Sequence, residues 1–190
     1  MDRSTAIQRC LSAFQEEPIV VTLGTTSREV IALAPSAPNH LHLLDSMGLA
    51  PSVAAGVAIG IASRTKTKVV ALEGDGGILM GFSIFATLAH LRVDNLVLLV
   101  LDDGVYAATG GQATGSDTVD LGAVARACGL AAKDVSQEAE LEAALAEARK
   151  STKAFVVRIH VDLAVSKRPL YLPDPPLLAQ RFRDYLSALV

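Results

Sequence analysis

Two apolar segments of this chain are each followed by glycine and aspartate, and this pairing constrains the fold more than any other feature. Residues 69–72 precede Gly74-Asp75-Gly76-Gly77, and residues 96–101 precede Asp102-Asp103-Gly104. Ligands of an open parallel sheet bind at the carboxyl ends of its strands. We therefore expect Asp75 and the Asp102-Asp103 pair to meet at one edge of a sheet, where carboxylate oxygens suit Mg²⁺ or Ca²⁺. Because Mg²⁺ seldom takes an all-protein cage, the pattern predicts a metal-bound phosphorylated ligand.

Strand-like and helix-like segments alternate along the chain. Short apolar runs predict strands at 19–23, 41–44, 68–73, 96–101 and 155–161. Periodic or capped segments predict helices at 2–17, 27–33, 50–63, 78–91, 120–127, 136–150 and 177–189, with a glycine-containing loop at 105–118. This alternation predicts an α/β fold, a single doubly wound parallel-sheet domain with right-handed crossovers. We expect residues 1–165 to form that domain and 166–190 to form a proline-rich C-terminal arm and helix laid over a neighbour.

Composition excludes several classes of function. With 190 residues and 51% hydrophobic content the chain can bury one core, and its net charge of −3 favours neither nucleic acid nor an anionic membrane surface. The longest apolar run, 53–62, is too short to span a bilayer, and no signal pattern leads the chain, so we expect a cytoplasmic protein without a membrane segment. Cys10 and Cys128 have no metal-ligand spacing and are expected to pack as small hydrophobic residues in a reducing compartment.

The glycine–aspartate pair resembles the cofactor motif of thiamine diphosphate (ThDP) enzymes, a GDG triplet followed by a helix, a strand and a terminal Asn pair. The resemblance implies that ThDP and Mg²⁺ are the cofactors. It assigns the metal to Asp75, to Asp103 and to the backbone carbonyl of Val105. Asp103 stands where the family usually has Asn. A carboxylate is an equally good oxygen ligand, but it adds a negative charge beside the diphosphate.

The same resemblance implies residues for the rest of the cofactor. Met47 would wedge ThDP into its bent conformation, the backbone at Asp45 would accept from the pyrimidine amine, and the amide of Met80 would face a ring nitrogen. Gly76 and Gly77 would present backbone N–H groups to the diphosphate at a helix start. The alternative for the two methionines is simple filling of the core.

Two further strings are similar to sulfopyruvate decarboxylase and phosphonopyruvate decarboxylase. They are residues 24–29, with the sequence GTTSRE, and residues 106–112, with the sequence YAATGGQ. The hydroxyls of Thr25, Thr26 and Ser27 suit a diphosphate. Arg28 could pair with a sulfonate, phosphonate or diphosphate oxygen, or else form a surface ion pair. Tyr106, with the cofactor, and Gln112 could line the substrate pocket, or could serve only to pack the loop.

The resemblance also implies a missing part. ThDP enzymes use a glutamate from a pyrimidine-binding domain, and the 190 residues hold one α/β unit. We therefore expect that glutamate from a pyrimidine-domain alpha subunit, in a hetero-oligomer with beta–beta contacts, and the catalytic residue of this chain itself stays unknown. The chain would be the beta-type subunit of a decarboxylase for a small anionic 2-oxoacid. The 2-oxoacid is expected to be 3-sulfopyruvate, giving sulfoacetaldehyde and CO₂, with phosphonopyruvate as the alternative.

Two other classes of function stay open on the sequence. The first is a non-catalytic partner, a domain that binds ThDP or a subunit but serves to regulate or scaffold. The departure from the family motif at Asp103 leaves this class open. An unrelated nucleotide-binding α/β module could use residues 74–77 as its phosphate loop, although neither a G-x-G-x-x-G nor a Walker pattern supports it.

Overall fold

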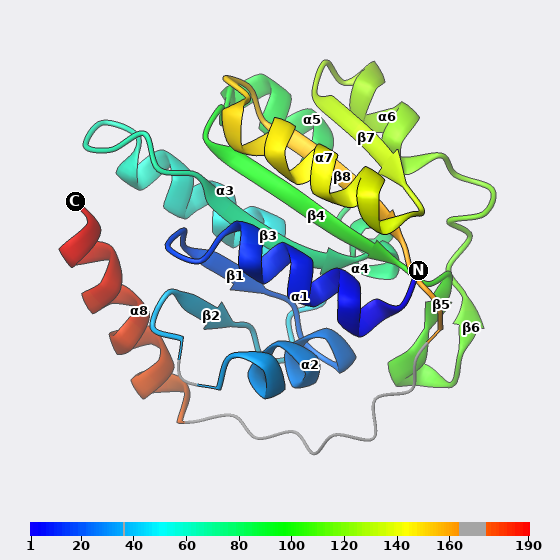
Figure 1. Ribbon diagram of the computed structural model, residues 1–190, viewed down its shortest axis with the longest axis horizontal. Coiled ribbons are helices and arrows are strands. Elements are labelled where there is room, and N and C mark those ends of the chain that lie inside the picture. Colours follow the sequence, from blue (N-terminus) through cyan, green and yellow to red (C-terminus); the bar gives the residue numbers. More distant parts are fainter. Residues whose placement is uncertain (36, 164–173) are drawn as a thin grey trace.

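The computed structural model describes residues 1–35, 37–163 and 174–190, and its centre is a six-stranded parallel sheet. Figure 1 shows this sheet with helices on both faces. The strand order is β2-β1-β3-β4-β8-β7. The strands are β1 (Ile19–Val21), β2 (His40–His42), β3 (Val69–Gly74), β4 (Leu96–Asp102), β7 (Ala131–Val135) and β8 (Phe155–His160). The predicted doubly wound α/β fold is confirmed.

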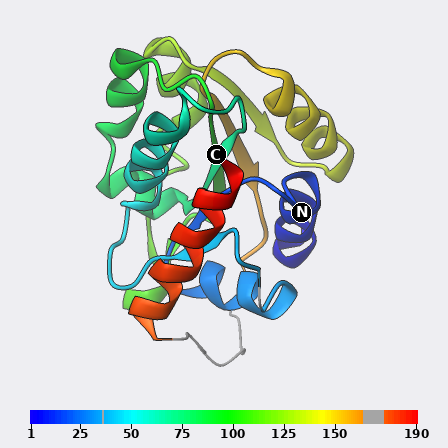
Figure 2. The ribbon, with the colours of Figure 1, turned by 90° about the vertical axis from the view of Figure 1, so that its left-hand side faces the viewer.

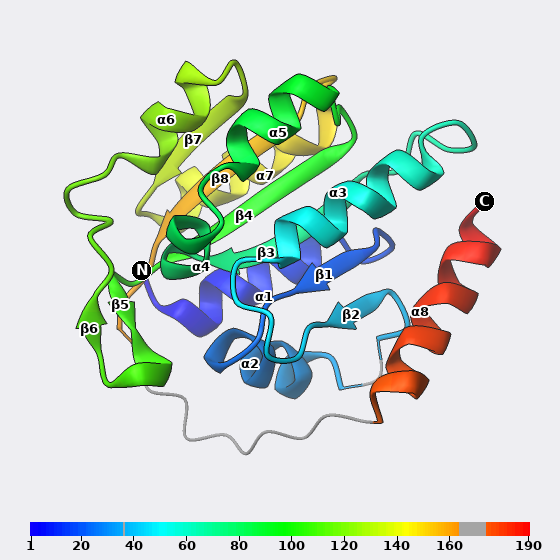
Figure 3. The same cartoon turned by 180° about the vertical axis from the view of Figure 1, so that it is seen from behind.

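Two buried clusters lie on opposite faces of the sheet. Helices α1 (Arg3–Ala13), α2 (Thr25–Leu33) and α7 (Glu138–Lys150) cover one face, and Figure 1 looks onto α1 and α7. Helices α3 (Ala50–Ile61), α4 (Asp75–Met80), α5 (Ile84–Leu91) and α6 (Leu121–Ala127) cover the other face, which Figure 3 turns forward. The side chains of β4 from Leu96 to Leu101 alternate between the clusters and are buried, so this central strand is apolar on both sides up to Asp102.

The connections reverse direction between β1 and β3. From β1 the chain crosses to its neighbour β2 on one side, and from β3 it crosses to β4 on the other. Such a reversal leaves a crevice at the carboxyl ends of the two strands, which is where ligands of open α/β sheets bind. The four segments that follow β1, β2, β3 and β4 therefore come out at the same edge of the sheet.

Several predicted elements differ from those in the structure. The continuous helix expected at 78–91 is two helices, α4 and α5, and Gly81 ends the first of them. Strand β7 was not predicted, because it is an edge strand with exposed Lys133 and Asp134. The loop at 105–118 contains a short hairpin, β5 (Val105–Tyr106) and β6 (Gln112–Ala113), around the 3₁₀ turn η1 (Ala107–Thr109). The cap of α7 is Gln137, one residue beyond the expected Ser136.

Helix α8 (Pro175–Leu189) packs on its own chain, beside edge strand β2 (Figure 2). Leu178 and Phe182 are its buried residues, and Phe182 belongs to the same core cluster as α3 and α5. The described part of the expected C-terminal arm is thus a helix that packs on the domain's own core. Residues 166–173 of that expected arm lie outside the described residues.

The two cysteines pack as predicted. Cys10 is buried in the cluster below α1, and burial raises the pKa of its thiol to about 12. Cys128 is partly buried against the opposite cluster. Within the described ranges, none of the helices has the length and apolar character needed to cross a bilayer.

Candidate functional site

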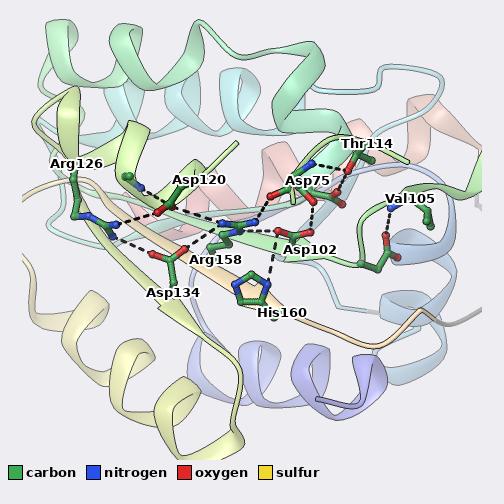
Figure 4. Close-up of polar contacts among 12 residues, drawn as sticks. Asp75, Asp102, Val105, Thr114, Asp120, Arg126, Asp134, Arg158 and His160 are labelled. Carbon is green, nitrogen blue, oxygen red and sulfur yellow. Dashed lines mark hydrogen bonds and ion pairs between the residues drawn. The ribbon is translucent and has the colours of Figure 1, made fainter. Parts of the chain in front are cut away.

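Asp75 lies at the edge of the sheet, where β3 gives way to α4. It is the first residue of α4 and is 2% exposed. The hydroxyl of Thr114, from the segment after β6, donates to Asp75 Oδ2 at 2.5 Å (Figure 4). Burial raises the pKa of Asp75, the Thr114 hydroxyl lowers it, and the neighbouring carboxylates of Asp102 and Asp103 raise it again. Negative charge is therefore concentrated at the ends of β3 and β4, as a bound divalent cation requires.

Asp103 follows β4 and accepts hydrogen bonds on both carboxylate oxygens. Arg3 Nη1 donates to Oδ2 at 3.0 Å, and the backbone N–H of Val105 donates to Oδ1 at 3.3 Å. The side chain is 11% exposed, so one side of it faces solvent at the sheet edge. The structure thus brings the two predicted metal-binding carboxylates close enough for the charge of Asp103 to raise the pKa of Asp75.

The backbone carbonyl of Val105 is directed away from its hairpin partner. The Gly104 carbonyl accepts from Thr114 N at 3.0 Å, and the Tyr106 carbonyl accepts from Gly111 N at 2.9 Å. In an antiparallel pair, residues alternate between facing the partner strand and facing away. Val105, between those two residues, therefore turns its carbonyl outward and leaves it available to a ligand.

The donor set fits Mg²⁺. Two carboxylates and a carbonyl are hard oxygen ligands, and they leave positions for phosphate oxygens and water. In the described part of the chain, no three His, Cys, Asp or Glu side chains form a metal-binding group of their own. A metal at this edge would thus depend on the Val105 carbonyl and on oxygens of the ligand.

Asp102 belongs to a different, structural network (Figure 4). Arg158 on β8 donates from Nε to Asp102 Oδ2 at 2.6 Å, and Ser116 Oγ donates to Oδ1 at 2.7 Å. Arg158 Nη2 also donates to the Ser116 carbonyl at 2.6 Å, which ties β8 to the loop after β6. Asp102 is therefore fully engaged, and Asp103 is the acid that remains at the edge. Arg158 was not among the predicted site residues, although a lone arginine inside an apolar strand was a signal for it.

The predicted diphosphate residues 25–27 begin α2, directly after Gly24 at φ 76°. Thr25 is half-buried. The hydroxyl of Thr26 accepts from Arg3 Nη2 at 2.6 Å, and that of Ser27 shares a hydrogen with His42 Nδ1 at 2.8 Å. Thr26 and Ser27 are buried and already bonded within the domain, so Thr25 is the hydroxyl best placed for a ligand.

Among the remaining predicted cofactor residues, Gly76 and Gly77 lie closely against side chains. A Cβ at Gly76 would overlap the ring of Tyr106, and one at Gly77 would overlap the carboxylate of Glu73. Asp45 is exposed and has φ 49°, a left-handed conformation that is uncommon for aspartate and often marks a functional loop. Met80 is 63% exposed, so core filling does not explain it.

Glu73, Met47 and the two predicted substrate residues differ in burial. Met47 and Arg28 are half-buried. Gln112 is exposed, and its amide bonds with Thr109 of the same hairpin, as in the loop-packing alternative. Glu73 is 1% exposed, burial raises its pKa, and its Oε2 has no hydrogen-bond partner among the residues described. Its position below Gly77 closes the core under the predicted diphosphate loop.

Residues 23–159 match the family described as thiamine pyrophosphate enzyme, C-terminal TPP binding domain, where TPP and ThDP are the same cofactor. The chain belongs to this family. The matched range contains every predicted cofactor and metal residue, from Thr25 to Gln112. The match also removes the alternative of an unrelated nucleotide-binding module.

Named relatives show which group of ThDP enzymes the chain resembles in sequence. The chain is 37% identical over 146 residues to sulfopyruvate decarboxylase subunit beta of Methanothermobacter thermautotrophicus, which covers 77% of this chain and 76% of that protein. It is 31% identical to the same subunit of Methanocaldococcus jannaschii over 91% of this chain and 90% of that protein. It is 37% identical to phosphonopyruvate decarboxylase of Streptomyces hygroscopicus over 97% of this chain, but spans only 46% of that protein. The chain is thus a member of the sulfopyruvate and phosphonopyruvate decarboxylase group of ThDP enzymes.

The fold is shared with larger ThDP enzymes. Benzoylformate decarboxylase from Polynucleobacter necessarius superposes with a TM-score of 0.72 at 18% sequence identity. The superposition covers 90% of this chain and 34% of that one. At this identity the likeness speaks for the fold alone, and this chain corresponds to one third of the larger enzyme.

Proposed function

We propose that this chain is the beta-type subunit of a ThDP-dependent decarboxylase that converts 3-sulfopyruvate to sulfoacetaldehyde and CO₂. One observation carries the proposal. The Asp75 and Asp103 motifs lie together with the outward carbonyl of Val105 at the switch point of the sheet, in a chain that matches named sulfopyruvate decarboxylase beta subunits over most of their length. The 37% identity to a phosphonopyruvate decarboxylase keeps 3-phosphonopyruvate as the second candidate substrate.

Different residues of this chain are assigned to the metal, to the diphosphate and to the rest of the cofactor. Asp75, Asp103 and the Val105 carbonyl would hold Mg²⁺, and Thr25 with the amides of Gly76 and Gly77 would hold the diphosphate. The rest of ThDP would be contacted by Asp45, Met47, Met80 and Tyr106. Thr26 and Ser27 would support the start of α2 from within the domain. When bound, ThDP supplies a carbon nucleophile for the keto group and an electron sink for the carbanion left by CO₂.

The substrate and the partner complete the site. Arg28 and Gln112 are the residues we assign to the anionic end of the 2-oxoacid, because a guanidinium suits a sulfonate or phosphonate. The activating glutamate is assigned to a pyrimidine-domain alpha subunit, since Glu73 is sealed in the core of this chain. Exposed Met80 beside this edge is consistent with a cofactor and partner that cover it.

The metal assignment is tested by Asp75→Ala in the complex with the partner subunit. We expect Mg²⁺-dependent ThDP affinity, measured by isothermal titration calorimetry, to fall at least about 100-fold, because the buried carboxylate ligand is lost. Asp117→Ala removes an exposed aspartate from the same loop region and should leave the affinity as it was. An unchanged dissociation constant in Asp75→Ala would remove the metal assignment.

The shared site is tested by assaying the chain with and without its partner. We expect CO₂ release from 3-sulfopyruvate only from the mixture, with slower release from 3-phosphonopyruvate. Turnover by the pure chain would refute the shared active site. ThDP and Mg²⁺ binding by the mixture without turnover of either oxoacid would instead favour the non-catalytic role.

A further inference from the structure

Arg3 is a buried cation that touches the proposed metal ligand. Its side chain is 4% exposed, and its three nitrogens have three different partners. Nη1 contacts Asp103 Oδ2 at 3.0 Å, Nε contacts Glu29 Oε2 at 3.2 Å, and Nη2 donates to Thr26 Oγ1 at 2.6 Å. The guanidinium therefore joins the start of α1 to α2 and to the end of β4.

The position of Arg3 is fixed from both sides. Asp2 caps α1 by accepting from Thr5 N at 2.7 Å, and the Met1 carbonyl accepts from Asp162 N at 2.9 Å. On the far side, Glu29 and Thr26 both come from α2 and hold the guanidinium against it. A planar fork that is held in this way presents Nη1–H to Asp103 in one orientation.

Asp103 consequently faces two hydrogen-bond donors, one on each oxygen. Arg3 donates to Oδ2 and the Val105 amide donates to Oδ1. A carboxylate accepts on both oxygens and keeps a lone pair for a metal, whereas the amide of Asn has a single acceptor oxygen. With Asn at this position, one of the two donors would face an NH₂ group. The carboxylate thus suits these neighbours at the one metal position where the chain departs from the family motif.

We propose that Arg3 is a positioning residue for the metal site, which offsets the extra charge of Asp103 and turns its carboxylate toward Mg²⁺. The inference rests on the proposed function, because it takes Asp103 as a ligand. It implies that the Asn of the family motif would be a weaker Mg²⁺ ligand than Asp at position 103 of this chain. Asp103→Asn would bind Mg²⁺ less tightly as long as Arg3 remains, because one of the two donors would face the NH₂ group and the guanidinium would compete with Mg²⁺ for the single amide oxygen.

The test is a double-mutant cycle of Asp103→Asn and Arg3→Gln, in the full chain with its partner. The readout is the Mg²⁺ dissociation constant at saturating ThDP, measured by calorimetry and, with Mn²⁺ as probe, by electron paramagnetic resonance. We expect Asp103→Asn to weaken Mg²⁺ binding about 10-fold or more, and the double variant to recover most of that loss. Arg9→Gln is the matched control, since Arg9 lies on the same helix but is 47% exposed and pairs with Glu138.

The outcomes of the cycle distinguish a positioning role of Arg3 from a general loss of folding. A general loss of folding would lower Mg²⁺ affinity further in the double variant, whereas the positioning role predicts recovery. Asp103→Asn that binds Mg²⁺ as tightly as the unsubstituted chain, or a double variant without recovery, would overturn this inference alone. Absence of Mg²⁺-dependent ThDP binding in the unsubstituted complex would overturn the proposed function and this inference with it.

Discussion

His40 and His42 lie on the same face of edge strand β2, with ring centroids 6.2 Å apart. Burial lowers the pKa of each to about 4, and for His42 the nearby His40 contributes as well. His40 Nδ1 has no hydrogen-bond partner in the described part of the chain, whereas His42 Nδ1 bonds with Ser27. Both rings are therefore neutral in the folded protein at physiological pH, and His42 supports the start of α2 beside the proposed diphosphate site.

This burial predicts how stability depends on pH. In the unfolded chain a histidine takes up a proton near pH 6.5, but the folded chain resists it down to about pH 4. The unfolded state thus binds more protons in that window, and the free energy of unfolding should fall as the pH falls from 6.5 toward 4. One such histidine accounts for up to roughly 3 kcal/mol. Urea unfolding of the apo chain at several pH values measures it.

A substitution isolates the contribution of one ring. His40→Leu removes a titrating group whose Nδ1 is unpartnered in the described structure, so it should flatten the pH dependence between 6.5 and 4. The same change at exposed His90 is the control. An equally steep decline in His40→Leu would show that other groups, His42 or carboxylates, set the dependence.

At the scale of one residue, the sequence identified the groups but not their neighbours. The glycine and aspartate motifs, together with the family that they resemble, led to Asp75 and Asp103. It could not show that Arg158 engages Asp102 or that Arg3 reaches Asp103, because those partners are 56 and 100 positions away. Contacts of that kind depend on which strands are adjacent, which a local pattern does not contain.

At the scale of elements, two glycines hold the loop after β2 against α4. A Cβ at Gly48 would lie 2.7 Å from the Gly77 carbonyl, and one at Gly81 would lie 2.8 Å from the Gly48 carbonyl. These are backbone atoms that cannot rotate away. The crossing explains why the helix expected at 78–91 is broken at Gly81, and why sequence periodicity alone missed the break: its cause is a segment more than thirty positions earlier.

This crossing predicts opposite effects for two glycine substitutions. Gly81→Ala should lower the free energy of unfolding by about 2 kcal/mol or more, because the new methyl group forces the two segments apart. Gly56→Ala, in the middle of α3, should raise it by about 0.5–1 kcal/mol, because helix propensity improves and no described atom lies within 4 Å of the new Cβ. Thermal and urea unfolding of both variants check this. Equal effects would show that the close approach does not constrain the fold.

At the scale of the whole molecule, the alternation of apolar runs and helices was sufficient to predict a parallel sheet covered on both faces. The parallel sheet alone predicted that both motifs would lie at the carboxyl edge of the strands. The full strand order did not, because β7 has too little apolar patterning to be recognised without its neighbour β8. The place of α8 was not predicted either, since its apolar residues suit a neighbour's surface as well as the chain's own.

The packing of α8 predicts a last pair of substitutions. Phe182 is 4% exposed within the core cluster, whereas Leu177 on the same helix is 51% exposed. Phe182→Ala should cost about 3 kcal/mol of unfolding free energy, and Leu177→Ala less than about 0.5 kcal/mol. Because α8 covers its own domain, the cost of Phe182→Ala in the apo chain should not vary with protein concentration. A cost that grows with concentration would mean that α8 is stabilised by a second chain, as the sequence first suggested.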